Sequence, residues 1–198
     1  MRFQFMLSVI YSSLLVSIRP EDDDYDDYEE DTTVASAPTS NRTKKPPQKG
    51  IDGVVYSVEE FLNTTDKIWV YNSTRNSSVI CTVDVMHEVN PLYANMTRYS
   101  LSGEVILNDT ADALFSVNPN LATNDDPYNE MRMESPENNR PFETLLYKSS
   151  DNQCGLFYIN YHAELNVLAG SWFELRVWNS SLDKGPHKNC SYFFEQFS

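Results

Sequence analysis

The sequence predicts an all-β domain in which many short antiparallel strands close into a barrel or stack as a sandwich, preceded by one short helix. Aromatic residues make up 13% of the chain, and most of them lie after residue 55. Stretches of β-branched and aromatic residues recur there at a steady spacing, with turn-forming residues between them. No repeat of 20–50 residues is visible, which argues against a propeller or a solenoid. One helix before about eight strands fits a calyx-like barrel that is wide enough for one small ligand.

The helix is expected over residues 58–62, because a capping box precedes it. Ser57 stands at the N-cap position and Glu60 at the third helical position. Tyr56 and Phe61 have the spacing of a hydrophobic staple.

The strands are recognised by composition and alternation. Residues 67–71 (KIWVY) are β-branched and aromatic, and residues 78–86 alternate between apolar and polar positions. Residues 118–141 are polar and contain four prolines, so we expect a long loop there. Residues 191–197 fit either a short helix or a last strand. The other expected strands are 95–101, 103–108, 113–117, 142–147, 154–161, 163–168 and 171–178.

The first fifty residues differ in composition from the rest. Residues 1–19 have a basic start and an apolar run too short for a membrane span, which predicts a secretory signal peptide. Residues 20–50 are acidic and then Pro/Ser/Thr-rich, typical of a disordered tail and linker. The barrel is therefore expected over residues 51–198. Tyr25 and Tyr28 lie among acidic residues, a context that suits tyrosine sulfation, and a purely solvating tail is the alternative.

Glycosylation signals support an extracellular location. Asn-X-Ser/Thr occurs eight times, far above a chance density, and each used site must lie on the surface. Three cysteines are present, so one disulfide in an exported chain would leave one cysteine unpaired. The spacing alone does not show which two are bonded. The eight sequons are at Asn41, Asn63, Asn72, Asn76, Asn95, Asn108, Asn179 and Asn189, and the cysteines are Cys81, Cys154 and Cys190.

Charge and motif content exclude several functions. The formal net charge of −14 argues against nucleic acid and anionic membranes and favours cationic partners. His87, His162 and His187 lack metal-ligand spacing, and no metal or cofactor is expected. Cys154 and His162 are the only nearby nucleophile–base pair, with no cleft implied, and no other catalytic signature occurs. We therefore expect a binding protein and no enzyme.

The C-terminal half resembles a known family. Residues 154–159 (CGLFYI), residues 173–177 (FELRV), then Pro186 and Cys190 with aromatic residues after it resemble the salivary lipocalins of ticks, the histamine-binding protein family. The resemblance covers about residues 55–198 and implies an eight-stranded antiparallel lipocalin barrel. It also implies a secreted protein of tick saliva that sequesters histamine, serotonin or a leukotriene and so suppresses host inflammation or haemostasis.

The resemblance implies particular cysteine and acid positions, and the chain departs from some of them. Cys81 is expected to pair with Cys190, which leaves Cys154 unpaired because Phe173 occupies its usual partner's place. Amine-binding members show Cys-Asp and later Glu-Leu-Trp or Glu-Leu-Tyr, whereas this chain has Gly155 and Arg176 at those positions. A buried ammonium needs a carboxylate, which Glu174, Glu164 or Asp84 could supply from another strand.

The ligand pocket is inferred from strand faces. Phe157, Ile159 and Tyr161 share one face, and Phe173, Leu175 and Val177 form a similar face. Water-facing sequons at Asn95 and Asn108 would turn Met96, Arg98, Val105 and Leu107 inward. An inward Arg98 would suit a fatty acid or an eicosanoid, whereas aromatic residues with Glu174 would suit an amine. A third possibility is a scaffold whose acidic arm docks a basic host protein. The predicted ligand-binding residues are Trp69, Tyr71, Met96, Arg98, Phe157, Ile159, Tyr161, Phe173, Glu174 and Leu175.

Overall fold

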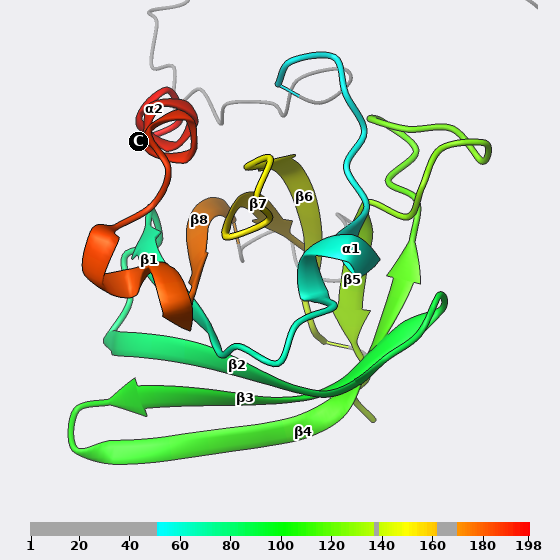
Figure 1. Cartoon of the computed structure of the whole chain (residues 1–198). Coiled ribbons are helices and arrows are strands. Elements are labelled where there is room, and N and C mark those ends of the chain that lie inside the picture. The colour runs from blue at the N-terminus through cyan, green and yellow to red at the C-terminus, as the bar shows by residue number, and fades with distance from the viewer. Residues whose placement is uncertain (1–50, 137–138, 162–169) are drawn as a thin grey trace, which may run out of the picture. The chain divides into compact units, whose positions relative to one another are not determined.

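The computed structural model describes residues 51–136, 139–161 and 170–198, and these form a closed barrel of eight antiparallel strands (Figure 1). Each strand pairs with the next along the chain, and β8 closes the ring on β1, where Ile68 is the partner of Trp178. This is the up-and-down barrel expected from the sequence and the architecture of lipocalins. The strands are β1 (Ile68–Ser73), β2 (Val79–Val89), β3 (Tyr93–Ser102), β4 (Val105–Ser116), β5 (Glu130–Met133), β6 (Phe142–Lys148), β7 (Cys154–Asn160) and β8 (Ser171–Trp178), and the helices are α1 (Val58–Leu62), the 3-10 helix η1 (Asn179–Lys184) and α2 (Lys188–Glu195).

Helix α1 has the expected bounds and N-cap. The Ser57 hydroxyl accepts a hydrogen bond from the backbone N–H of Glu60 at 3.2 Å. Val58, Phe61 and Leu62 are buried, so this short helix fills one end of the barrel interior. Residues 191–197, expected as either a short helix or a last strand, are helical up to Glu195, where helix α2 ends.

Two strand assignments differ from the expectation. The expected strands 103–108 and 113–117 fall on one continuous strand, β4, because Asp109, Thr110 and Asp112 between them continue the pairing with β3. Strand β5 lies inside the expected loop of residues 118–141. It is only four residues long and pairs with both β4 and β6, so tertiary pairing rather than local composition determines it. The expected strand 163–168 lies outside the described residues.

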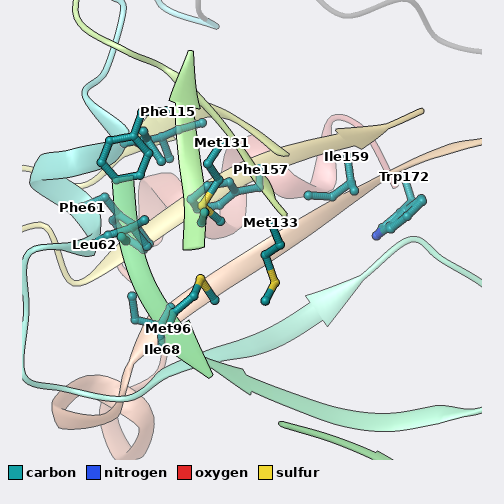
Figure 2. Packing of buried hydrophobic residues seen from close by; sticks show 14 residues of the cluster. Phe61, Leu62, Ile68, Met96, Phe115, Met131, Met133, Phe157, Ile159 and Trp172 are labelled. Atoms are coloured by element: carbon teal, nitrogen blue, oxygen red, sulfur yellow. The ribbon is translucent and has the colours of Figure 1, made fainter. Parts of the chain in front are cut away.

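Buried apolar residues form two clusters on opposite faces of the sheet. The inner cluster contains Phe61, Met96, Phe157, Ile159 and Trp172, and Figure 2 shows Trp172 beside Ile159 and away from Phe61. The outer cluster lies beneath α2. It is made of Leu121, Leu146, Tyr147, Cys154, Leu156, Tyr158, Phe173, Leu175, Val177, Cys190 and Phe194.

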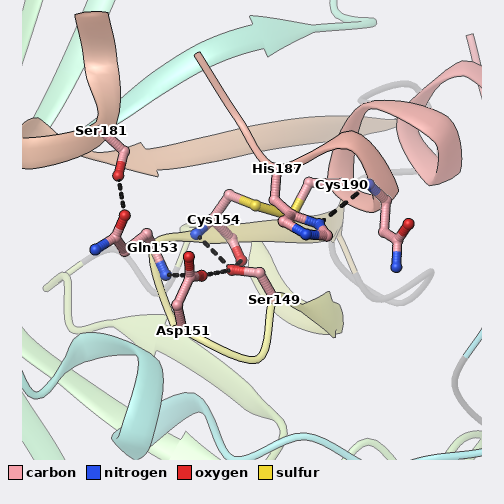
Figure 3. The surroundings of a disulfide bond; sticks show 8 residues. Ser149, Asp151, Gln153, Cys154, Ser181, His187 and Cys190 are labelled. Atoms are coloured by element: carbon pink, nitrogen blue, oxygen red, sulfur yellow. Dashed lines mark hydrogen bonds between the residues drawn. A yellow bond between two sulfur atoms is a disulfide. The ribbon is translucent and has the colours of Figure 1, made fainter. Parts of the chain in front are cut away.

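The disulfide corrects the expected pairing. Cys154 is bonded to Cys190, and Cys81 is a free cysteine (Figure 3). Cys190 is buried in α2, which packs on β6, β7 and β8, and Cys154 begins β7 directly beneath that helix. Cys81 lies on β2, whose barrel neighbours are β1 and β3, so it is not within reach of Cys190. The resemblance therefore gave the wrong partner.

Several sequence predictions fall on residues outside the described part. These are the signal peptide, the acidic tail with Tyr25 and Tyr28, the sequon at Asn41, and the residues His162 and Glu164. Within the described residues, no helix combines the length and the apolar character needed to cross a bilayer. Six of the seven described sequon asparagines are exposed, and Asn95 is half-buried.

Candidate functional site

One end of the barrel opens into a cavity of about 860 Å³. The ends of β1, β3, β5 and β7 and the beginnings of β2, β6 and β8 surround it, so we call this end the mouth. Its volume lies in the range that holds a drug-sized molecule. Its lining includes Tyr71, Arg75, Arg98, Glu143, Ile159, Tyr161, Trp172, Glu174 and Arg176.

The floor of the cavity is a network of charged side chains, three of which are almost completely buried. Arg98 on β3 donates from Nε to Asp84 Oδ1 at 2.7 Å and from Nη2 to Asp84 Oδ2 at 2.9 Å. The same guanidinium also donates to both Glu143 oxygens, from Nη1 at 2.5 Å and from Nη2 at 3.0 Å. Arg98 therefore holds β2 and β6 together across the barrel interior, and most of its N–H groups are already engaged.

Arg176 on β8 is the second guanidinium of this network. Its Nη2 lies 2.6 Å from Glu143 Oε2 and 2.6 Å from Glu174 Oε2, and its guanidinium lies over the Phe157 ring, 4.3 Å from the centroid. The side chain is only 2% exposed. Its Nη1 lies 3.8 Å from Asp84 Oδ2 and has no hydrogen-bond partner in the described structure. The cation–π contact with Phe157 thus stabilises the buried charge of Arg176.

The two arginines keep Glu143 ionised. Burial by itself raises the pKa of Glu143, but the nearby Arg176 and Arg98 guanidiniums outweigh burial and lower this pKa from 4.5 to about 2. The pKa of Arg98 is raised, because Asp84 and Glu143 offset the opposing effect of burial. Three carboxylates (Asp84, Glu143 and Glu174) and two guanidiniums therefore meet on the floor, a formal excess of one negative charge within this set, while Arg75 and Arg140 also line the cavity.

Glu174 is the carboxylate nearest to the open part of the cavity. It is 14% exposed, whereas Asp84 and Glu143 are almost completely buried. Its Oε1 accepts a hydrogen bond from Trp172 Nε1 at 2.8 Å. The Arg75 guanidinium lies over the Trp172 ring, 4.4 Å from the centroid, and Arg140, which also lines the cavity, forms an ion pair with Asp109. The mouth therefore brings together the Trp172 ring, the Glu174 carboxylate and the long cationic side chains of Arg75 and Arg140.

Half of the predicted ligand-binding residues line this cavity. Tyr71, Arg98, Ile159, Tyr161 and Glu174 do so. Met96 and Phe157 also face inward, but they belong to the packed inner cluster. Trp69 does not line the cavity, and its Nε1 donates to Asn179 Oδ1 at 3.0 Å.

The prediction that Phe173 and Leu175 point into the barrel is wrong, because the other face of β8 points inward. Both residues belong to the outer cluster beneath α2, with Val177. Trp172, Glu174 and Arg176 alternate with them and line the cavity. The apolar face of β8 is thus covered by the C-terminal helix, and its charged face lines the interior.

Val105 and Leu107 lie on the expected face but are not buried. They alternate with Asp109, the pairing partner of Arg98, so they share the inward face of the sheet. They remain 59% and 57% exposed, because the β3–β4 hairpin extends beyond the packed interior at the mouth.

Glu143, Trp172 and Arg176 line the cavity but were not among the predicted ligand-binding residues. Glu143 stands beside the apolar run of β6, where it read as the start of an ordinary strand. A carboxylate at a position that alternates with buried Leu145 was the available signal, because a charge on a buried face needs a partner.

Gly155 stands where the resembling amine-binding proteins carry an acid, and the packing explains its identity. A Cβ built on Gly155 would lie 3.0 Å from Phe61 Cε2 and 3.1 Å from Leu145 Cδ1. Helix α1 therefore occupies the space that a side chain here would need. The carboxylates of the interior come instead from β2, β6 and β8.

Comparisons with known proteins give only distant similarities. No protein-family model matches the chain, and no curated protein matches it. The siderocalin Ex-FABP, described as functioning through dual ligand specificities, is 6% identical with a TM-score of 0.45, and the match covers 67% of this chain and 82% of that one. Japanin from Rhipicephalus appendiculatus, solved with bound cholesterol, is 12% identical with a TM-score of 0.43, covering 67% and 86%. These values are too low to assign a family or a ligand to this chain.

Proposed function

We propose that this chain is an extracellular binding protein that captures a small cationic amine, such as histamine or serotonin, in the barrel mouth without chemical turnover. The supporting observation is that the floor network joins three carboxylates to two guanidiniums, and that Glu174 is the most exposed of the three carboxylates. A ligand ammonium that reaches Glu174 would bring the formal charge of this five-group network to zero. Desolvating an ammonium is costly unless it meets such a counter-charge.

Aromatic side chains around Glu174 strengthen the case for an amine. Trp172 donates to Glu174 and holds its carboxylate in place, and Tyr161 lies next to Trp172, with ring centroids 6.3 Å apart. Aromatic faces attract organic cations, most strongly where water is excluded. Arg75 lies over Trp172 at present, so an arriving amine would replace this guanidinium on the ring.

A carboxylate ligand, such as a fatty acid or a leukotriene, is the second candidate. Arg98 was its expected partner, but Asp84 and Glu143 already engage that guanidinium. Arg75 at the mouth is the observation that favours this candidate, because its charge faces an aromatic ring rather than a carboxylate in the described structure.

Calorimetric titration of the glycosylated protein separates the two candidates. We expect histamine or serotonin to bind at pH 7 and arachidonic acid to bind weakly or not at all. The Glu174→Gln variant should lose at least tenfold in amine affinity, since it removes the excess charge. Glu60→Gln, which alters an exposed carboxylate outside the barrel interior, is the matched control. Binding of arachidonic acid but of neither amine would overturn the proposal.

A further inference from the structure

An apolar rim continues the cavity wall above the charged floor. It consists of Val79, Ile80, Val105 and Leu107, which we call the lip. Val79 and Ile80 line the cavity, while Val105 and Leu107 lie on the inward face of the adjoining β3–β4 hairpin. The turn of this hairpin lies at the outer left of Figure 1. All four side chains are exposed, and Ile80 reaches 66%.

Polarity changes in order along the inward face of β2, β3 and β4. Asp84, Arg98 and Asp109 form the innermost row, because each is the pairing partner of the next. The next row contains Thr82 and Ser100, whose hydroxyls lie 3.4 Å apart, and Leu107. The last row contains Val79 and Val105, on either side of Ser102. The wall therefore passes from charge through hydroxyl to apolar over a few residues.

The two faces of the hairpin are distinguished by a glycosylation signal. Ile106, which is 68% exposed, alternates with Leu107 and lies on the outward face with Asn108. The lip side chains lie on the cavity side of the wall, two on β2 and two on β4, with Ser100 and Ser102 of β3 between them. Exposed apolar side chains next to a cavity are typical of a ligand-binding surface.

We infer that the ligand is an amphiphilic amine, in which the ammonium meets Glu174 on the floor and an attached apolar chain lies against the lip. This inference rests on the proposed function and narrows its ligand class. Continuity supports it, since Val79 and Ile80 belong both to the cavity wall and to the lip. A small hydrophilic amine alone would leave the lip exposed to water.

A series of straight-chain alkylamines from ethylamine to decylamine tests the inference, with each kept below the concentration at which it forms micelles. We expect the affinity to rise twofold to fourfold per methylene once the chain reaches the lip, as burial of a methylene group predicts. Alkanoates of the same lengths should bind far more weakly, because their charge has the wrong sign.

Leu107→Ser and Ile106→Ser form a matched pair of variants, since the two residues are neighbours, similarly exposed and on opposite faces. Leu107→Ser should reduce the gain with chain length at least threefold for decylamine and leave ethylamine unchanged. Ile106→Ser should leave both unchanged. Both variants remove exposed apolar surface, so their folding, checked by thermal unfolding, is expected to match that of the parent.

The outcomes distinguish this inference from the proposed function. Equal affinity for short and long amines, or equal effects of the two variants, would overturn the inference and leave amine capture standing. Failure of every amine at every length would overturn the proposed function and this inference with it.

Discussion

The five charged side chains of the floor depend on one another, and Glu143 is central because both arginines contact it. Its folded pKa of about 2 lies below its ordinary value of 4.5, so the unfolded chain takes up the proton first as the pH falls. The stabilisation is therefore complete above about pH 4.5 and is lost progressively as the pH falls toward 2. The shift corresponds to about 3 kcal/mol.

Glu143→Gln should consequently destabilise the protein by about 3 kcal/mol at pH 7, because it leaves two buried guanidiniums short of a partner. The difference from the parent should shrink between pH 4.5 and 2. Urea unfolding of both proteins at a series of pH values measures this difference. A difference that stays constant down to pH 2 would contradict the assignment, and Glu60→Gln, in a surface ion pair, should change little.

Gly155 gives a second prediction at the residue scale. Gly155→Ala places a methyl group about 3 Å from Phe61 and Leu145, closer than ordinary packing allows. We expect a loss of about 1–3 kcal/mol, because overpacking forces neighbours to shift. Chemical denaturation provides the measurement. Adding Phe61→Leu should recover part of the loss, and strict additivity of the two changes would argue against the contact.

At the scale of elements, the Cys154–Cys190 disulfide fastens α2 to the barrel, with a sequence separation of 36 residues. The chain-entropy model gives about 3–4 kcal/mol for a loop of this size. We expect the double variant Cys154→Ser/Cys190→Ser to lose a stability of this order and to expose the outer cluster beneath α2 to the fluorescent dye ANS. Denaturant unfolding gives the free energy.

Cys81→Ser is the control for this change, since Cys81 forms no disulfide. It should unfold like the parent. In addition, a thiol reagent applied without a reductant should label only Cys81 among the three cysteines. Labelling of Cys154 or Cys190 under those conditions would contradict the assigned pairing.

The elements show how far local sequence determines this fold. The capping box predicted α1 correctly, because its hydrogen bond is made within four residues. Strand β5 escaped prediction, because its four residues are set by pairing to β4 and β6. On β8 the sequence shows that apolar and charged residues alternate, but it does not show which of the two faces points into the barrel. Phe173 and Leu175 looked like interior residues, yet α2 supplies their apolar environment from outside.

In the molecule as a whole, as on β8, charged side chains face part of the interior and apolar side chains face outward under a helix. The mouth half of the interior carries charges, and apolar residues fill the other half and the space beneath α2. The rule that apolar faces point inward therefore fails where a barrel keeps a polar cavity. Buried charges without nearby sequence partners, such as Glu143 and Arg176, are recognised as a network only once the strands are closed.

A final prediction concerns the separate contributions of the acidic N-terminal segment and the barrel to binding. If binding depends on the barrel cavity alone, deletion of residues 20–45 should leave the amine affinity and the thermal unfolding midpoint unchanged, because the charges and aromatic rings of the site all lie beyond residue 70. Calorimetry and thermal unfolding of both chains, purified from a eukaryotic host, measure the two quantities.

A probe that is basic but not a ligand, such as polylysine, provides the contrasting readout. The full chain should bind it in a salt-sensitive manner and the shortened chain should bind it less, since residues 21–31 are almost entirely acidic. Loss of amine binding on deletion, with the barrel still folded, would show that the acidic arm takes part in capture and that the cavity alone is insufficient.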